Sequence, residues 1–217
     1  MPRGSARCWC RIVADGMRLD GRGALVTGSI GGLGLAMASR LAAAGASVVL
    51  TSLEVPEVAE PQRAALEARF NVPVHYVSAD LSDRAALRGL VEQAQAACGV
   101  IDILVNNAVV RHFAPVEDFP LDAWDRALSV NLTAALIATQ LVLPGMRARG
   151  YGRIFNMTSV YGSRATVQRV DYVTTKTALQ GMTRAIALET AGSPVSCHAL
   201  TPGSVLTPIW EARVEAL

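Results

Sequence analysis

Six short apolar segments recur along this chain, and each is followed by a segment of helix length or by the chain end. They are ALVT (24–27), SVVL (47–50), VHYVS (74–78), IDILVN (101–106), RIFNMTS (153–159) and VSCHAL (195–200). Strands that alternate with helices are joined by crossovers, the connection that parallel strands need. The pattern therefore predicts an α/β fold with a doubly wound parallel sheet, its helices at roughly 33–44, 57–69, 82–98, 120–149 and 169–191.

Composition favours one globular domain with a small-molecule partner. Of the 217 residues, 51% are apolar and 18% are charged, which is enough apolar material for a buried core. Twenty basic and 18 acidic residues give a net charge of +2 without a block of either sign, so we expect neither nucleic acid nor a membrane as partner. Glycines interrupt the weakly charged segment 24–53, which predicts buried α/β structure there rather than a bilayer helix.

Cysteine and histidine spacing predicts no metal site. Cys8, Cys10, Cys98 and Cys197 form no CxxC pair, and the three histidines are scattered. Reduced thiols are typical of a cytoplasmic protein. Residues 1–16 contain basic side chains but no apolar core of signal-peptide length, so we interpret them as an extension of unknown use before a domain at 17–217.

The turn after the first predicted strand is rich in glycine. It reads Thr27-Gly28-Ser29-Ile30-Gly31-Gly32-Leu33-Gly34, and a helix follows at once. Glycine permits positive φ and close approach of the backbone to a pyrophosphate, whose charge then lies at the positive end of the helix. A tight turn without a ligand is the alternative, but its place in the first strand-helix unit favours a dinucleotide.

The residues at the end of the second strand indicate whether the dinucleotide is NAD or NADP. An acid there would bind the ribose 2′-hydroxyl of NAD, and an arginine would bind the 2′-phosphate of NADP. The sequence reads Thr51-Ser52-Leu53-Glu54, without a basic residue, so NAD is favoured over NADP. After the third strand, Asp80 and Leu81 would either cap the next helix or contact the adenine.

Tyr172 and Lys176 lie four residues apart in RVDYVTTKTAL (169–179), so on a helix they share one face. An ammonium beside a phenol favours loss of the phenol proton and lowers its pKa. Such a tyrosine can exchange a proton at neutral pH, although an arbitrary pair of this spacing is more often a solvated helix pair.

Together these motifs resemble those of the short-chain dehydrogenase/reductase family, from about Leu19 to the C-terminus. The residues that carry the resemblance are Thr27-Gly28 through Gly34, Asp80, Asn106-Asn107-Ala108, Asn131, Ser159, Tyr172, Lys176 and Pro202-Gly203. The stretches IDILVNNA, EDFP, ALETAG and PGSVLTP are most similar to bacterial 3-hydroxybutyrate dehydrogenases. The resemblance implies a Rossmann-type fold.

It also implies an enzyme that interconverts a secondary alcohol and a ketone with NAD(P). Tyr172 would be the general acid/base, Lys176 would lower its pKa and hold the nicotinamide ribose, Ser159 would bind the reacting oxygen, and Asn131 would hold a water that links Lys176 to solvent. The cofactor would contact Gly28, Ser29, Ile30, Gly32, Leu33, Gly34, Asp80, Leu81, Asn107, Ala108, Tyr172, Lys176, Pro202, Gly203 and Val205.

Several positions depart from that family. Val109 replaces a glycine and would be strained if its φ were positive. In the positions that bind the acid in 3-hydroxybutyrate enzymes, the chain has Arg111, Tyr161, Arg169, Ser204 and Arg213 in place of glutamine, histidine, lysine, tryptophan and glutamine. Arginines bind carboxylates well, so a small hydroxy acid stays plausible, with Arg111, Tyr161 and Arg169 as substrate residues.

The family ordinarily continues beyond Leu217 through further helices and a seventh strand. We therefore expect an open sheet edge and an open apolar face. The alternative to an enzyme is a truncated, non-catalytic remnant that binds a nucleotide or a partner without turnover. The helices at 120–149 and 169–191, through which relatives assemble, predict a homo-oligomer.

Overall fold

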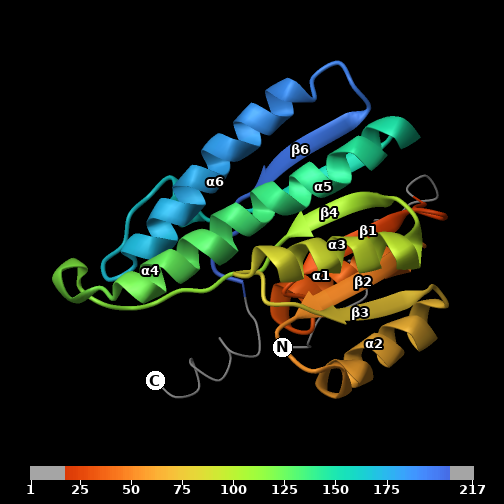
Figure 1. The fold of residues 1–217 in the computed structure, drawn as a ribbon, viewed down its shortest axis with the longest axis horizontal. Helices are drawn as coiled ribbons and strands as arrows, with labels where there is room; N and C mark the ends of the chain where they lie inside the picture. The colour runs from red at the N-terminus through yellow and green to blue at the C-terminus, as the bar shows by residue number, and fades with distance from the viewer. Residues whose placement is uncertain (1–17, 206–217) are drawn as a thin grey trace, which may run out of the picture.

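A computed structural model describes residues 18–205, so the extension at 1–16 and Arg213 lie outside the described part. Six strands form one sheet: β1 (Gly23–Thr27), β2 (Ser47–Ser52), β3 (Val74–Ser78), β4 (Ile101–Asn106), β5 (Gly152–Met157) and β6 (Val195–Leu200). All pairs are parallel, in the order β3-β2-β1-β4-β5-β6 (Figure 1). The order reverses at β1, which confirms the doubly wound sheet.

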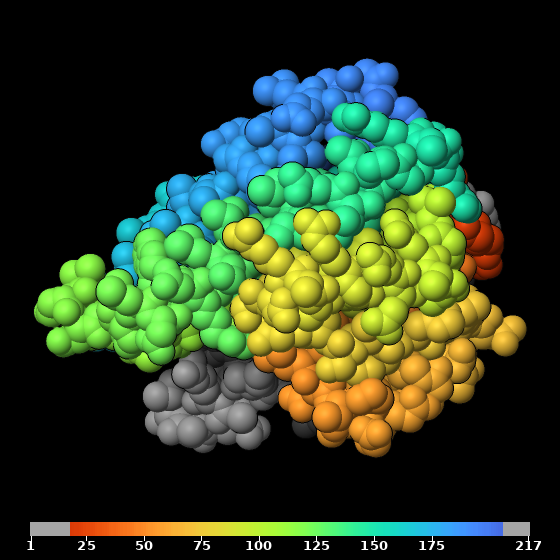
Figure 2. Space-filling view, in the orientation of Figure 1, coloured from red at the N-terminus to blue at the C-terminus, as the bar shows by residue number. Residues whose placement is uncertain are grey.

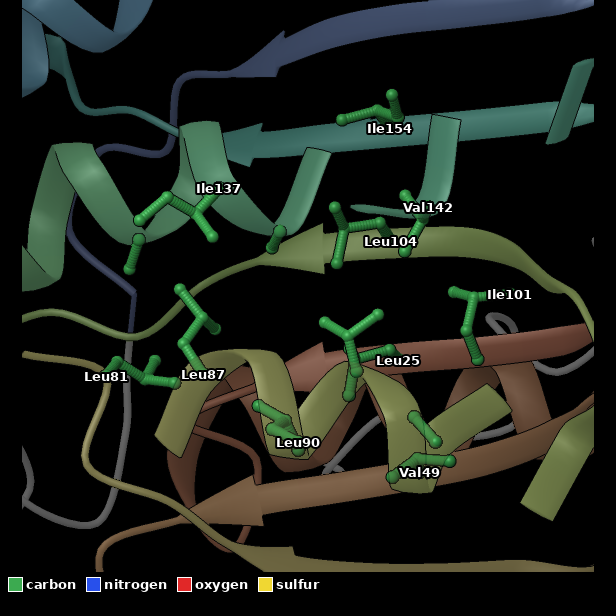
Figure 3. Packing of buried hydrophobic residues seen from close by; sticks show 14 of the residues in the cluster. Leu25, Val49, Leu81, Leu87, Leu90, Ile101, Leu104, Ile137, Val142 and Ile154 are labelled. Atoms are coloured by element: carbon green, nitrogen blue, oxygen red, sulfur yellow. The ribbon is translucent and has the colours of Figure 1, made fainter. Parts of the chain in front are cut away.

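Helices cover both faces of the sheet because successive strand residues point to opposite sides. Leu25, Leu104 and Ile154 pack under α3 (Arg84–Cys98), α5 (Ala134–Arg149) and α6 (Val170–Glu189), as Figure 3 shows for α3 and α5. Their neighbours in sequence, such as Val26 and Val105, pack on the other side with α1 (Gly32–Ala43) and α2 (Pro56–Phe70). The core therefore lies in two layers, one on each side of the sheet.

The predicted helix at 120–149 is not uniform. It consists of α4 (Leu121–Leu128), one π-helical turn η2 (Ser129–Thr133) and α5. By length and apolar content residues 121–149 match a membrane span, but half of the most apolar stretch is buried inside the protein. α5 packs beside α3 (Figure 2) and also over β4 and β5, so its composition is that of a core helix.

β6 forms the outer strand of the described sheet. Its partner is β5, and on the α1 side the His198 ring stacks on Phe155 with 5.5 Å between ring centroids. Within the part of the chain that the structure describes, His198 and Leu200 are exposed.

The close contact between α1 and the turn after β1 gives a test of the fold. A Cβ at Gly34 would lie 2.1 Å from the Gly28 carbonyl oxygen and 2.6 Å from Asn107 Nδ2. We expect Gly34→Ala to lower the free energy of unfolding by about 1–3 kcal/mol through overpacking. Gly89→Ala in α3 is the control, since its Cβ meets nothing within 4 Å; it should raise stability by about 0.5–1 kcal/mol. Urea unfolding measures both, and an unchanged Gly34→Ala midpoint would contradict the packing.

Candidate active site

A cleft of about 840 Å³ opens at the carboxyl ends of the strands, where a doubly wound sheet binds its ligand. The residues predicted from the sequence that line it are Gly28, Ile30, Gly32, Leu33, Gly34, Asp80, Leu81, Asn107, Ala108, Arg111, Tyr172, Lys176, Pro202, Gly203 and Val205. Segments from five parts of the chain thus meet around one cavity. Ser29, Asn131, Ser159, Tyr161 and Arg169 are not among its lining residues.

The glycine turn suits a pyrophosphate. Gly28 has φ +62°, and a Cβ there would lie 2.9 Å from Ala108 Cα, so the position needs glycine on both counts. The N-cap of α1 is Gly31, no side chain caps the helix, and the first turn contains no acid. Its first N–H groups therefore face the cleft without an intramolecular side-chain acceptor, which fits a bound phosphate.

Ser29 lies behind the glycine turn. Its hydroxyl is fully buried, donates to the Val26 carbonyl oxygen at 2.6 Å and accepts from the Thr51 N–H at 3.0 Å. The side chain thus joins the ends of β1 and β2 behind the turn.

Hydrogen bonds also join β1 to β4 where the two strands end. Thr27 Oγ1 accepts from the N–H groups of Asn107 and Ala108 at 2.9 and 3.0 Å. Asn107 Nδ2 donates to the carbonyl oxygens of Thr27 and Gly28, both at 2.9 Å. The glycine turn is therefore fixed to the segment after β4 across the bottom of the cleft.

The end of β2 offers no cation to the cleft. Ser52, Leu53 and Glu54 line it there, and the basic lining residues, Arg111, Arg126 and Lys176, come from other segments. The Tyr76 hydroxyl donates to the Glu54 carbonyl oxygen at 2.5 Å and lies 2.8 Å from Ser52 Oγ, which fixes this loop.

Asp80 lies at the cleft rather than in a helix cap. Its Oδ1 accepts from the N–H and the hydroxyl of Ser82 at 2.9 and 2.7 Å, and Arg126 lies 3.7 Å from its Oδ2. The Ser82 hydrogen bonds first, and the Arg126 charge with them, lower the pKa of Asp80. Asp83 caps α3 instead, by accepting from the Ala85 and Ala86 N–H groups.

Lys176 is buried in the wall of the cleft beside Tyr172. Only 3% of the residue is exposed, its Nζ donates to the Met157 carbonyl oxygen, and it lies 5.6 Å from the centroid of the Tyr172 ring. Burial, and secondly the charge of Arg111, lower the pKa of Lys176 to about 8. The predicted pair thus shares one face of α6, with the ammonium in a site that weakens its hold on a proton.

Asn131 and Ser159 lie behind the wall of the cleft. Asn131 donates to the Val110 carbonyl oxygen and to Thr175 Oγ1 at 2.8 and 3.2 Å, and its Oδ1 accepts from the Val110 N–H at 2.8 Å. A cavity of about 10 Å³ beside it has the volume of roughly one water molecule. The Ser159 hydroxyl accepts from the Tyr161 N–H at 3.2 Å.

Tyr161 and Arg169 stack beside the cleft. The ring centroids of Tyr161 and Tyr172 are 6.5 Å apart, edge to face, and the Arg169 guanidinium lies 4.4 Å from the centroid of the Phe113 ring. Val109 does not have positive φ, so the valine in place of glycine is not strained in the way considered above.

Two side chains at the site escaped the sequence analysis. Arg126 lines the cleft and reaches Asp80 from α4, a contact that no local spacing reveals. Asp171 is fully buried directly before Tyr172. An acid next to the candidate tyrosine, at the start of a helix with few charges, is a signal that could have found it.

Comparisons agree with this geometry. Residues 22–217 match the short chain dehydrogenase family, so the chain belongs to the short-chain dehydrogenases/reductases, enzymes that act on CH–OH groups. It is 42% identical to the D-beta-hydroxybutyrate dehydrogenase of Cupriavidus necator, over 91% of this chain and 76% of that one.

Two further proteins represent other substrates within this family. The 2-dehydro-3-deoxy-L-rhamnonate dehydrogenase (NAD(+)) of a Sphingomonas species is 36% identical, over 88% of this chain and 75% of its own. The crystal structure of L-sorbose reductase from Gluconobacter frateurii, complexed with NADPH and L-sorbose, superposes with a TM-score of 0.87 at 30% identity, over 92% of this chain and 76% of that one.

The state of Lys176 can be measured without interference, because it is the single lysine of the chain. In protein labelled with ¹³Cε-lysine, we expect one NMR signal that titrates with a midpoint at a pKa of about 8, since burial disfavours the ammonium. In urea the midpoint should return toward the ordinary value of about 10.4. A folded-state midpoint at that ordinary value would contradict the buried position.

Proposed function

We propose that this protein is an NAD-dependent dehydrogenase that interconverts a small secondary hydroxy acid and the corresponding keto acid. The observation that carries the proposal is the placement of Tyr172 beside the buried Lys176 on the wall of a dinucleotide-sized cleft. The similarity to the hydroxybutyrate enzyme supports the substrate class.

The lining of the cleft favours NAD. The pyrophosphate would lie on the N–H groups at the start of α1, and the adenosine would lie between the ends of β2 and β3, near Ser52 and Asp80. A 2′-phosphate would meet Glu54 and no cation from this loop, so NADP would bind more weakly.

The bound nicotinamide would supply or accept a hydride, and the side chains would handle the proton. In the direction of ketone reduction, Tyr172 would give its hydroxyl proton to the ketone oxygen. Ser159, whose neighbour Thr158 lines the cleft, would donate a hydrogen bond to that oxygen. Lys176, which lines the same cleft, would hold the nicotinamide ribose. Asn131 holds the water through which the proton of Tyr172 is replaced.

Arg111 lines the same cleft and would bind the substrate carboxylate as a charge-assisted pair. Tyr161 and Arg169, which stack beside the wall, complete this end of the site. A keto acid held there would present its carbonyl to Tyr172.

The same proposal includes a soluble cytoplasmic homo-oligomer without nucleic acid or membrane as partner. Leu136 on α5 and Leu188 on α6 are exposed on the helices through which we expect subunits to pair. Burial of such residues by a second copy would remove apolar surface from water.

Replacement of Tyr172 tests the chemistry directly. We expect Tyr172→Phe to lower kcat for NADH-dependent reduction of 3-oxobutyrate by about 10²–10⁴-fold, because the proton donor is lost. The dissociation constant of NADH, measured by fluorescence transfer to the bound nicotinamide, should change little. Tyr151→Phe is the control, since that ring packs against Arg22 outside the cleft. Equal activity of Tyr172→Phe and wild type would refute the assignment.

Cofactor preference gives a second test. We expect NADH to bind more tightly than NADPH, and Leu53→Arg to strengthen NADPH binding by about tenfold, because it adds a cation beside the ribose. Leu53 lines the cleft, whereas the exposed Val55 does not, so Val55→Arg is the matched control. Tighter binding of NADPH than NADH by the wild type would overturn the assignment of NAD.

A further inference from the structure

Asp171 is a buried carboxylate that the proposed chemistry does not use. It is fully inaccessible, and both of its hydrogen-bond donors between residues 18 and 205 are backbone N–H groups. Oδ1 accepts from the Tyr172 N–H at 2.6 Å, and Oδ2 accepts from the His112 N–H at 3.0 Å. A buried charge is costly unless it is hydrogen-bonded, so both of these hydrogen bonds stabilise the buried carboxylate.

The contact with His112 joins α6 to the segment that follows β4. Asn131 binds the same segment at Val110, two residues before His112. It accepts from the N–H of Val110 and donates to the carbonyl oxygen of Val110. Thr175 connects the two tethers, since its Oγ1 donates to the Asp171 carbonyl oxygen at 2.8 Å and accepts from Asn131 Nδ2. The backbone is thus held at positions 110 and 112, on both sides of Arg111.

Arg111 itself is exposed at the cleft and lies close enough to Lys176 to lower the pKa of that lysine. Two cations that face one cavity favour an anion between them. A long arginine side chain on a free loop would lose much rotational and backbone freedom on binding that anion, whereas a fixed backbone reduces this cost.

We propose that Asp171 is a positioning residue that fixes the backbone around Arg111, so that the cleft selects ketones that carry a carboxylate. This inference rests on the proposed function, since it concerns the substrate end of the same site. Asparagine cannot replace the carboxylate, because an amide has one oxygen and Asp171 serves two N–H groups.

The experiment compares Asp171→Asn, Arg111→Gln and the double variant, with the exposed Asp122→Asn of α4 as the control for loss of one negative charge. The substrates are 3-oxobutyrate and its neutral methyl ester, with NADH at saturation. We expect Asp171→Asn and Arg111→Gln each to raise KM for the acid by about 10–100-fold and to leave KM for the ester within about twofold. KM of the double variant for the acid should not exceed that of Arg111→Gln, because the two residues act through one contact.

Titration of the single lysine gives a readout that needs no turnover. Arg111→Gln removes a cation near Lys176 and should raise the pKa of Lys176. Asp171→Asn should raise the pKa of Lys176 too, because it displaces Arg111, whereas loss of the Asp171 charge alone would lower that pKa. Thr175→Val removes the link between the two tethers and should shift KM for the acid and the pKa of Lys176 in the same directions. This variant replaces Asp171→Asn in the experiment if Asp171→Asn does not fold.

Equal changes in KM for acid and ester, or a pKa of Lys176 that stays constant or falls in Asp171→Asn, would overturn the proposal. A wild type that reduces neither ketone would refute the proposed function instead, and the lysine titration would still decide whether Asp171 positions Arg111.

Discussion

The cleft depends on the hydrogen bonds between Thr27 and Asn107, where β1 and β4 end and the chain turns away in opposite directions. One hydroxyl accepts two N–H groups, and one amide donates to two carbonyl oxygens. The connections after β1 and β4 leave for opposite faces of the sheet, so the space between them opens into a crevice. The Thr27–Asn107 contact fixes the glycine turn on one side and the loop with Arg111 on the other, and it holds the width of the crevice between them.

A second constraint is the burial of Lys176. An ammonium with 3% exposure loses most of its hydration, and the hydrogen bond to the Met157 carbonyl oxygen offsets only part of that loss. This desolvation of Lys176 disfavours folding, and it occurs in the helix that also contains Tyr172. A buried lysine has little value for stability, whereas a lysine that holds its proton weakly near the Tyr172 hydroxyl suits the proton transfer that we propose for that hydroxyl.

Much of this could be predicted from the sequence because the signals were local. All six strands lie where the apolar segments placed them, and the pair Tyr172 and Lys176 shares a helix face because four residues make one turn. The π turn at Ser129–Thr133 was missed, since a helix with one extra residue in a turn keeps the same apolar composition.

Side-chain direction was harder to predict than position. Ser29 lies in the glycine turn as expected, but its hydroxyl bonds back to Val26 and Thr51, which no spacing indicates. The contacts of Asp171 with His112 and of Arg126 with Asp80 join residues that are 59 and 46 positions apart. Such pairs become visible only when the fold brings the elements together.

We propose that this cleft transfers a hydride between a nicotinamide and a secondary carbon. The most direct measurement is the reduction of 3-oxobutyrate with NADH that carries deuterium at both C4 positions, followed by NMR of the product. We expect deuterium at C3 of 3-hydroxybutyrate, in equal amount to the NADH consumed. Oxidation of NADH without deuterium at that carbon, or the absence of any product from folded protein that binds NADH, would contradict it.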